Sequence, residues 1–149
     1  MASSTAFYKK LYVDGSEITP SPTPPEPVTE LTILTAGYEG ESFGVTGSSF
    51  NWQKVGEWIQ FSGFVVYSTL PVSPGSVYLP LPSQLRSLYG VPDNEIALAS
   101  LTSALPNLIL QSDGINNDGF ILTSNGTPVN SAAMPPADTL IFSGKYRLF

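Results

Sequence analysis

Residues 50–82, FNWQKVGEWIQFSGFVVYSTLPVSPGSVYLPLP, decide the fold of this chain. Over residues 58–68 of this stretch, apolar and polar side chains alternate with a period of two. Successive side chains of a β-strand point to opposite faces, so a strand is predicted here with one face in a core. The core-facing set is Ile59, Phe61, Gly63, Val65 and Tyr67.

The opposite face of this strand starts polar, at Gln60 and Ser62, and becomes apolar at Phe64 and Val66. Such a change predicts that the strand passes from a half-exposed position to one covered on both sides. The dipeptide Val55-Gly56 is expected to bend the chain into the strand. The stretch LPVSPG at residues 70–75 is expected to end it, because Pro, Ser and Gly favour turns. The next strand is then expected over residues 76–81.

Other stretches show the same alternation or turn punctuation. In the first of them, residues 29–35, Leu31 and Ile33 are expected to point inward. Residues 94–101 are expected to form a strand that carries Ile96 and Leu98. A short helix is expected over residues 83–89. Further strands are expected over residues 49–55, 107–111, 120–123 and 139–149, the last with Leu140, Phe142, Gly144, Tyr146 and Leu148 on one face.

About eight short strands separated by turn residues indicate an all-β domain. We therefore predict an antiparallel, jelly-roll-like β-sandwich over residues 28–149. Residues 1–27 are predicted to be an extended, proline-rich arm that precedes it.

The predicted arm has two parts. Residues 6–13, AFYKKLYV, fit a short strand with Phe7 and Leu11, or Tyr8 and Tyr12, as anchors, followed by a turn at residues 14–16. Five of the eight residues 20–27 are proline, which favours a stiff, extended spacer. A disordered tail and a partner-binding anchor are both consistent with this pattern, and we favour the anchor.

The amino-acid composition limits the classes of function that are expected for this chain. Charged residues make up 12% of the 149-residue chain, against ~25% in a typical globular protein. We therefore expect part of the surface to be buried against a partner. The net charge is −6 and the six Lys and Arg residues form no cluster, which argues against nucleic-acid binding.

Several residue types that carry chemistry are missing from the sequence. It has no cysteine and no histidine, so disulfides and thiolate or imidazole metal sites are excluded. Neither a membrane-length apolar run nor the apolar core of a secretion signal is present, and synthesis in a cytoplasm is expected. Acidic residues at 39, 41, 57, 93 and 95 are interpreted as solvated side chains rather than a glycosidase pair. We expect no catalytic residue, no metal and no cofactor.

Two further features have alternative interpretations. The loop SDGINNDG at residues 112–119 offers oxygen ligands for a cation, but Asn, Asp and Gly also dominate tight turns, which we favour. The aromatic residues Trp52, Tyr78 and Tyr89 are candidates for contact with a glycan or with another subunit.

Three short motifs stand in a distinctive order: FNWQKVGEWIQFSG at residues 50–63, VYLPLP at residues 77–82 and IFSGKY at residues 141–146. This order resembles that in β-sandwich domains of bacteriophage virion proteins. The resemblance implies a module of tail fibres, head spikes or capsid decoration proteins, usually trimeric about a threefold axis. It supplies no catalytic residue.

Two functional hypotheses follow from the resemblance. In the first, the chain is a homotrimeric capsid decoration (cement) protein on the virion surface. It is made in the host bacterial cytoplasm, and Phe7, Tyr8, Leu11 and Tyr12 of its arm bind the major capsid protein. In the second, it is a short tail fibre or receptor-binding knob that attaches to a baseplate protein and contacts a host glycan. Neither involves a membrane or nucleic acid.

Overall fold

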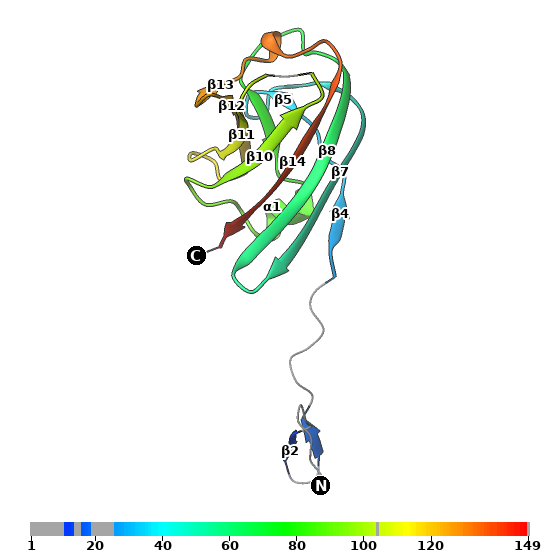
Figure 1. Cartoon of the computed structure of the whole chain (residues 1–149), viewed down its shortest axis with the longest axis vertical. Coiled ribbons are helices and arrows are strands. Elements are labelled where there is room, and N and C mark those ends of the chain that lie inside the picture. The colour runs from blue at the N-terminus through cyan, green and yellow to red at the C-terminus, as the bar shows by residue number, and fades with distance from the viewer. Residues whose placement is uncertain (1–10, 14–15, 19–25, 104, 149) are drawn as a thin grey trace.

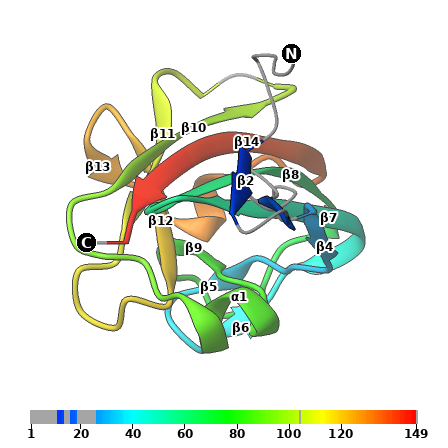
Figure 2. The ribbon, with the colours of Figure 1, turned by 90° about the horizontal axis from the view of Figure 1, so that it is seen from below.

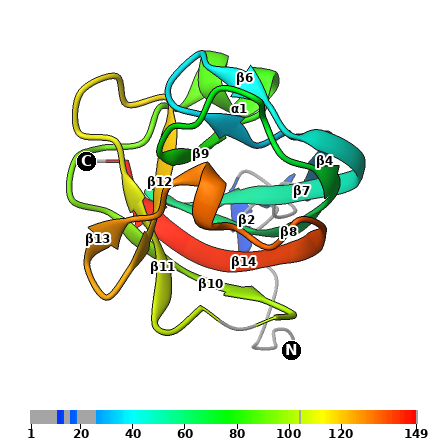
Figure 3. The same ribbon diagram turned by 90° about the horizontal axis from the view of Figure 1, so that it is seen from above.

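The computed structural model describes residues 11–13, 16–18, 26–103 and 105–148. These residues form an antiparallel all-β fold with one short α-helix (Figure 1). The predicted fold class is therefore confirmed. The two facing layers belong to a single sheet that curls into a half-barrel (Figures 2 and 3).

The elements of the sheet are short except for three long strands. In chain order they are β4 (Val28–Glu30), β5 (Thr35–Ala36), β6 (Glu41–Ser42), β7 (Gly44–Val55), β8 (Trp58–Thr69), β9 (Val77–Pro80), β10 (Ile96–Leu101), β11 (Leu108–Ser112), β12 (Gly119–Ser124), β13 (Thr127–Pro128) and β14 (Asp138–Arg147). In space they run β4-β7-β8-β14-β10-β11-β12-β9-β5-β6, with β13 beside β12. The helix α1 (Ser83–Leu88) lies next to β5 and β6, and a 3₁₀ turn spans Ser131–Ala133 (Figures 2 and 3).

A separate two-stranded sheet, β2 (Leu11–Val13) with β3 (Ser16–Ile18), lies within the predicted arm. The strand expected over residues 6–13 agrees with β2 at its end, and the return strand β3 was not expected. Residues 6–10, the tip of the turn and the proline-rich residues 19–25 lie outside the described residues, as do Phe7 and Tyr8.

The hairpin of β7 and β8 is closed by the bend expected at Val55-Gly56. Val55 pairs with Trp58, and Gly56 has a φ of 62°, a conformation that glycine adopts without steric cost. The last strand, β14, then pairs with β8 over ten consecutive positions, from Asp138 opposite Tyr67 to Arg147 opposite Trp58. Segments nearly eighty residues apart in sequence are thus neighbours in the centre of the sheet.

The core lies inside the curl. The inner residues of β8 expected from the alternation, Ile59, Phe61, Val65 and Tyr67, are all buried. Phe61 contacts the ring of Phe120 in β12, on the opposite layer, with centroids 5.4 Å apart. The inner face predicted for the last strand is also confirmed, since Leu140, Phe142 and Tyr146 are buried.

The expectation that Leu31 and Ile33 point inward is wrong. Leu31 is 80% exposed and Ile33 is 43% exposed, whereas Thr32 and Leu34 are buried. The strand β4 ends at Glu30, and the next residues are held by other bonds: the Thr32 amide donates to Ser48 Oγ (3.1 Å) and its hydroxyl to the Pro80 carbonyl (3.2 Å). These bonds favour a buried Thr32, so the alternation is shifted by one residue.

Glu30 joins three parts of the fold. The cap position of α1 is occupied by Pro82, whose side chain provides no cap, and Glu30 supplies the missing acceptor from β4. Its carboxylate accepts the amides of Gln84 (2.9 Å) and Leu85 (3.1 Å) and the indole N–H of Trp52 (2.8 Å). A negative charge at a helix N-terminus stabilises unpaired amides, so one side chain ties β4, β7 and α1 together.

Asp138 plays a similar part at the start of β14, on the inner face. Its buried carboxylate accepts the amides of Thr102 (3.1 Å) and Ser103 (3.0 Å), and both of their hydroxyls. Burial alone raises the pKa of this group, but the hydrogen bonds from Ser103, Thr102 and Thr139 outweigh it and hold the pKa well below its ordinary value. The carboxylate therefore stays charged and fixes the connection after β10.

Candidate functional site

The outward side of the central strands carries large apolar side chains. Phe64 in β8 is 40% exposed and Leu98 in β10 is 70% exposed. We call this region the outer apolar face, and it comprises Trp58, Phe64, Ile96, Leu98 and Ile141. The expectation that the strand is covered on both sides at Phe64 and Val66 is therefore wrong for Phe64, whereas Val66 is half-buried. Ala97, not its neighbours Ile96 and Leu98, fills the core under β10.

The strand register makes this face continuous. Phe64 is directly opposite Ile141 across β8 and β14, and Leu98 is opposite Ser143, two residues further along β14. On its other side Leu98 is opposite Ile109, which is half-buried. Side chains opposite or diagonal across neighbouring strands contact each other. The result is an apolar stripe across four adjacent strands, flanked by polar residues such as Ser62 and Ser143.

A groove of about 440 Å³ adjoins one end of the stripe. It is lined by Trp58, Ile96, Leu98, Ile109 and Lys145, among others. The Lys145 ammonium lies 4.8 Å from the centroid of the Trp58 ring, at a distance where a cation is attracted to the ring face. The groove therefore combines apolar walls with one basic side chain, Lys145, and one acidic side chain, Glu95.

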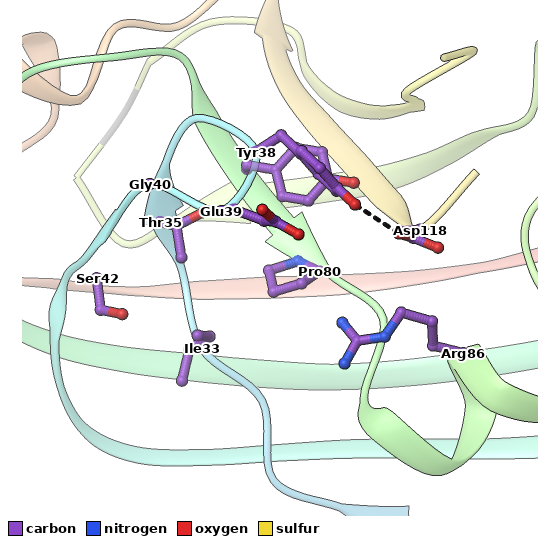
Figure 4. Close-up of a pocket in the computed structure, with 10 residues that line it drawn as sticks. Ile33, Thr35, Tyr38, Glu39, Gly40, Ser42, Pro80, Arg86 and Asp118 are labelled. Atoms are coloured by element: carbon purple, nitrogen blue, oxygen red, sulfur yellow. Dashed lines mark hydrogen bonds between the residues drawn. The ribbon is translucent and has the colours of Figure 1, made fainter. Parts of the chain in front are cut away.

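A second concave region lies at the other layer of the half-barrel. This pocket, of about 440 Å³, is lined by residues of β5, the β5–β6 turn, β9, α1 and the loop before β12 (Figure 4). We call it the Tyr38 pocket, and its walls include Ile33, Thr35, Tyr38, Glu39, Pro80, Arg86 and Asp118.

Tyr38 is held at both ends. Its ring packs edge-on against the buried Tyr78, with centroids 5.6 Å apart, and its hydroxyl donates to Asp118 Oδ2 at 2.9 Å. The hydrogen bond to Asp118, together with burial and the charges of Asp118 and Glu39, raises the pKa of Tyr38 to about 12. The hydroxyl thus keeps its proton at neutral pH. Its neighbour Glu39 has a φ of 55°, in a region that residues other than Gly, Asn and Asp seldom adopt.

The loop between β11 and β12 is a connection within a hairpin, as predicted for residues 112–119. The Asp113 carboxylate accepts hydrogen bonds from the Tyr78 hydroxyl (3.3 Å) and from Asn116 Nδ2 (2.9 Å). Among the described residues, no group of three or more His, Cys, Asp and Glu side chains is placed to hold a metal ion. The Asp113 carboxylate thus ties the start of the loop to Asn116 and to Tyr78 of β9.

The three aromatic residues singled out from the sequence do not form one surface. Trp52 packs edge-on against Tyr89 at 6.2 Å, whereas Tyr78 lies at the Tyr38 pocket. Trp52 and Tyr78 are only 5% and 3% exposed, which leaves each little side-chain surface for a partner. Of the arm residues, Leu11 and Tyr12 lie in β2, where the backbone alone is described.

Besides Asp93, which accepts a hydrogen bond from Asn117 Nδ2 at 3.0 Å, two of the acidic residues considered from the sequence have structural partners. The Glu41 carboxylate accepts the amides of Val72 and Ser73, each at 3.0 Å, and this lowers its pKa. Glu57 pairs with Arg147 at 3.2 Å across the start of β8 and the end of β14. These contacts give both side chains a role in holding loops and strand ends.

Sequence reasoning missed the residues that now matter most. No pattern of spacing in the sequence links Tyr38 to Asp118, eighty residues away. The outer apolar face has a sequence signal in the apolar residues Phe64, Ile96 and Leu98, but Phe64 is expected to be covered within the fold, and no orientation is predicted for Ile96 and Leu98. Within the described ranges the one α-helix is far too short to cross a membrane.

Searches of protein-family models, of curated proteins and of solved structures found no match to this chain.

Proposed function

We propose that this chain is a structural protein of a bacteriophage virion, a capsid decoration protein that assembles as a homotrimer through its outer apolar face. The observation that supports assembly is this face, where Phe64 is exposed opposite Ile141 and Leu98 is exposed on the next strand, diagonally across from Ile141. The phage context rests on the resemblance of residues 50–63, 77–82 and 141–146 to virion domains.

The outer apolar face is expected to be stabilised when it is buried away from water. Burial of apolar surface contributes ~25 cal/mol per Å², and soluble monomers seldom expose a continuous apolar patch of several hundred Å². Packing the same face of each copy around a rotation axis covers it in a closed assembly. The flanking Ser62, Ser143 and Gln60 then form a polar rim, the usual arrangement at subunit contacts.

The arm supplies attachment in this proposal. Phe7, Tyr8, Leu11 and Tyr12 contact the major capsid protein, and the prolines of residues 20–27 reduce the entropy lost when the arm is fixed. Three arms on one trimer bind as a multivalent unit, so weak individual contacts combine into strong attachment.

The first experiment measures the mass of the purified chain by light scattering. We expect three times the 15.9 kDa of one chain, and a shift toward the monomer in Phe64→Asp and Ile141→Asp. The matched control is Ile115→Asp, which changes an 85%-exposed apolar residue in the β11–β12 loop, away from the face. A monomeric parent chain, or trimers unaffected by both face variants, would contradict the assembly proposal.

The second experiment concerns location. Antibodies to the chain are expected to label the heads of virions. A variant lacking residues 1–27 is expected to remain a trimer but no longer to bind the heads. Unchanged head occupancy without the arm would rule out anchoring by the arm. Labelling at the tail would replace the decoration role with the alternative, a receptor-binding knob attached to a baseplate protein.

A further inference from the structure

The Tyr38 pocket offers an aromatic surface that is already fixed in position. Tyr38 is 42% exposed, yet its ring is held against Tyr78 and its hydroxyl by Asp118. A ligand that stacks on this ring therefore causes little further loss of side-chain conformational entropy. Preorganisation of this kind lowers the entropic cost of binding.

The walls of the pocket carry both hydrogen-bond acceptors and donors. Glu39 and Arg86 come from opposite sides, from the turn after β5 and from α1, and both side chains reach toward Pro80 (Figure 4). Asp118 presents a carboxylate beside the Tyr38 hydroxyl, and Ser42 presents a hydroxyl at the far end (Figure 4). Polar groups are therefore arranged around the pocket rather than on one side.

The rest of the lining is apolar. Pro80 lies at the middle of the pocket and Ile33 lies beside it (Figure 4). A volume of about 440 Å³ is at the lower end of the ~300–1,000 Å³ typical of small-molecule sites. The site fits a small molecule that has apolar patches and hydroxyl groups together.

Charge narrows the class of ligand. Two carboxylates, Glu39 and Asp118, disfavour phosphates and other strong anions, because like charges repel at short range. The Arg86 guanidinium in the same pocket opposes a cation such as an amine. A neutral molecule remains, with hydroxyls that donate to the carboxylates and accept from the guanidinium.

We propose that the Tyr38 pocket binds a neutral sugar ring, with the C–H face of the sugar on Tyr38 and its hydroxyls on Glu39, Asp118 and Arg86. This inference stands on the pocket alone. It does not depend on trimer formation or on where the chain sits on a particle.

The test is saturation-transfer NMR on the full-length protein with glucose, galactose, mannose and N-acetylglucosamine, each as its methyl glycoside. We expect at least one of them to bind at millimolar concentration. Tyr38→Ala and Arg86→Gln are both expected to weaken that binding by about tenfold or more. The matched control, Arg147→Gln, changes another exposed arginine, one that lies outside the pocket at the end of β14, and is expected to leave binding unchanged.

Three outcomes would overturn the inference. The first is that none of the four glycosides binds. The second is that binding persists in both Tyr38→Ala and Arg86→Gln, each confirmed as folded by its melting curve. The third is that n-butylamine or inorganic phosphate, tested in the same way, binds at the pocket while the sugars do not. None of these results depends on the mass measurement that tests assembly, so the two proposals fail separately.

Discussion

The inner and outer faces of β8, β14 and β10 are made by the same strands, and both carry large apolar side chains. On the inner face Phe61 and Phe142 are 5% and 2% exposed and contact each other's rings, and Phe61 also contacts Phe120 across the core. On the outer face Phe64 and Ile141 are 40% and 49% exposed. The difference shows that apolar character alone does not identify the core of this sheet.

The two faces also differ in their small residues. The inner face has glycine at Gly63 and Gly144, where a Cβ atom would meet the Phe142 ring at 2.8 Å and the Phe61 ring at 3.2 Å, respectively. The outer face has serine at Ser62 and Ser143, which stay exposed beside the stripe. Space on the inner face is thus shared among closely packed rings, whereas the outer face leaves its large apolar side chains exposed.

Removal of one aromatic ring from each face is expected to give the largest difference in the free energy of unfolding. Phe61→Ala should lower the free energy of unfolding by about 3–5 kcal/mol, because it leaves a cavity in a packed core. Phe64→Ala should lower it by about 1 kcal/mol or less when measured on dilute, dissociated chains. Urea unfolding measures both, and equal losses would remove the distinction between the faces.

A smaller effect is expected from Gly63→Ala. The added Cβ meets the Ser49 carbonyl oxygen and the Phe142 ring, so the free energy of unfolding should fall by about 1–3 kcal/mol. The control is Gly47→Ala in the neighbouring strand β7, where a Cβ meets nothing within 4 Å. That variant should be neutral or slightly stabilising in the same urea titration.

The contribution of Asp138, at the polar end of the inner face, can be measured from the pH dependence of stability. Its folded-state pKa is lowered, so its stabilising contribution is present above the ordinary aspartate pKa of ~3.9 and is lost as the pH falls below it. At pH 7, Asp138→Asn should be less stable than the parent by about 1–3 kcal/mol. The gap should narrow steadily below about pH 4 in denaturation curves. A gap independent of pH would mean that the charge of Asp138 contributes nothing.

The smallest effect is expected on the outer face, at Lys145. Replacement by glutamine removes the cation over Trp58 and should change the free energy of unfolding by about 0.5–1 kcal/mol at most. The tryptophan fluorescence of Lys145→Gln should shift, whereas that of Lys54→Gln, whose ammonium lies over Tyr89, should not. A loss of several kcal/mol in Lys145→Gln would show that this face is part of the core.

The sequence predicted the fold well where one face of a strand is apolar and the other polar. Ile59, Phe61 and Tyr67 in β8, and Phe142 and Tyr146 in β14, satisfy that condition, and all are buried. The sequence did not decide the orientation of a strand where the residues of either face could have filled the core. In β10 the small Ala97 fills the core while the larger Ile96 and Leu98 face out, and size alone indicated the opposite.

The Tyr38 pocket could not be predicted for a different reason. Its parts come from the β5–β6 turn, β9, α1 and the loop before β12, and the pairing of β5 and β12 with β9 brings them together. That pairing is not encoded in any local spacing. The shift of one residue at Thr32 has a similar origin, because its bonds to Ser48 and Pro80 depend on the curl of the sheet.

The hydrogen bonds of Glu30 have a mechanical consequence. If residues 1–27 tether the domain to a larger body, any pulling force enters the sheet at Val28, the first residue of β4. That strand is only three residues long, and Val28, Thr29 and Glu30 pair with Trp52, Asn51 and Phe50. The Glu30 carboxylate spreads the load to the indole of Trp52 and to the backbone of α1. Tension on the arm would thus be shared between the β4–β7 pairing and the hydrogen bonds of Glu30, which add α1 to the structure that resists it.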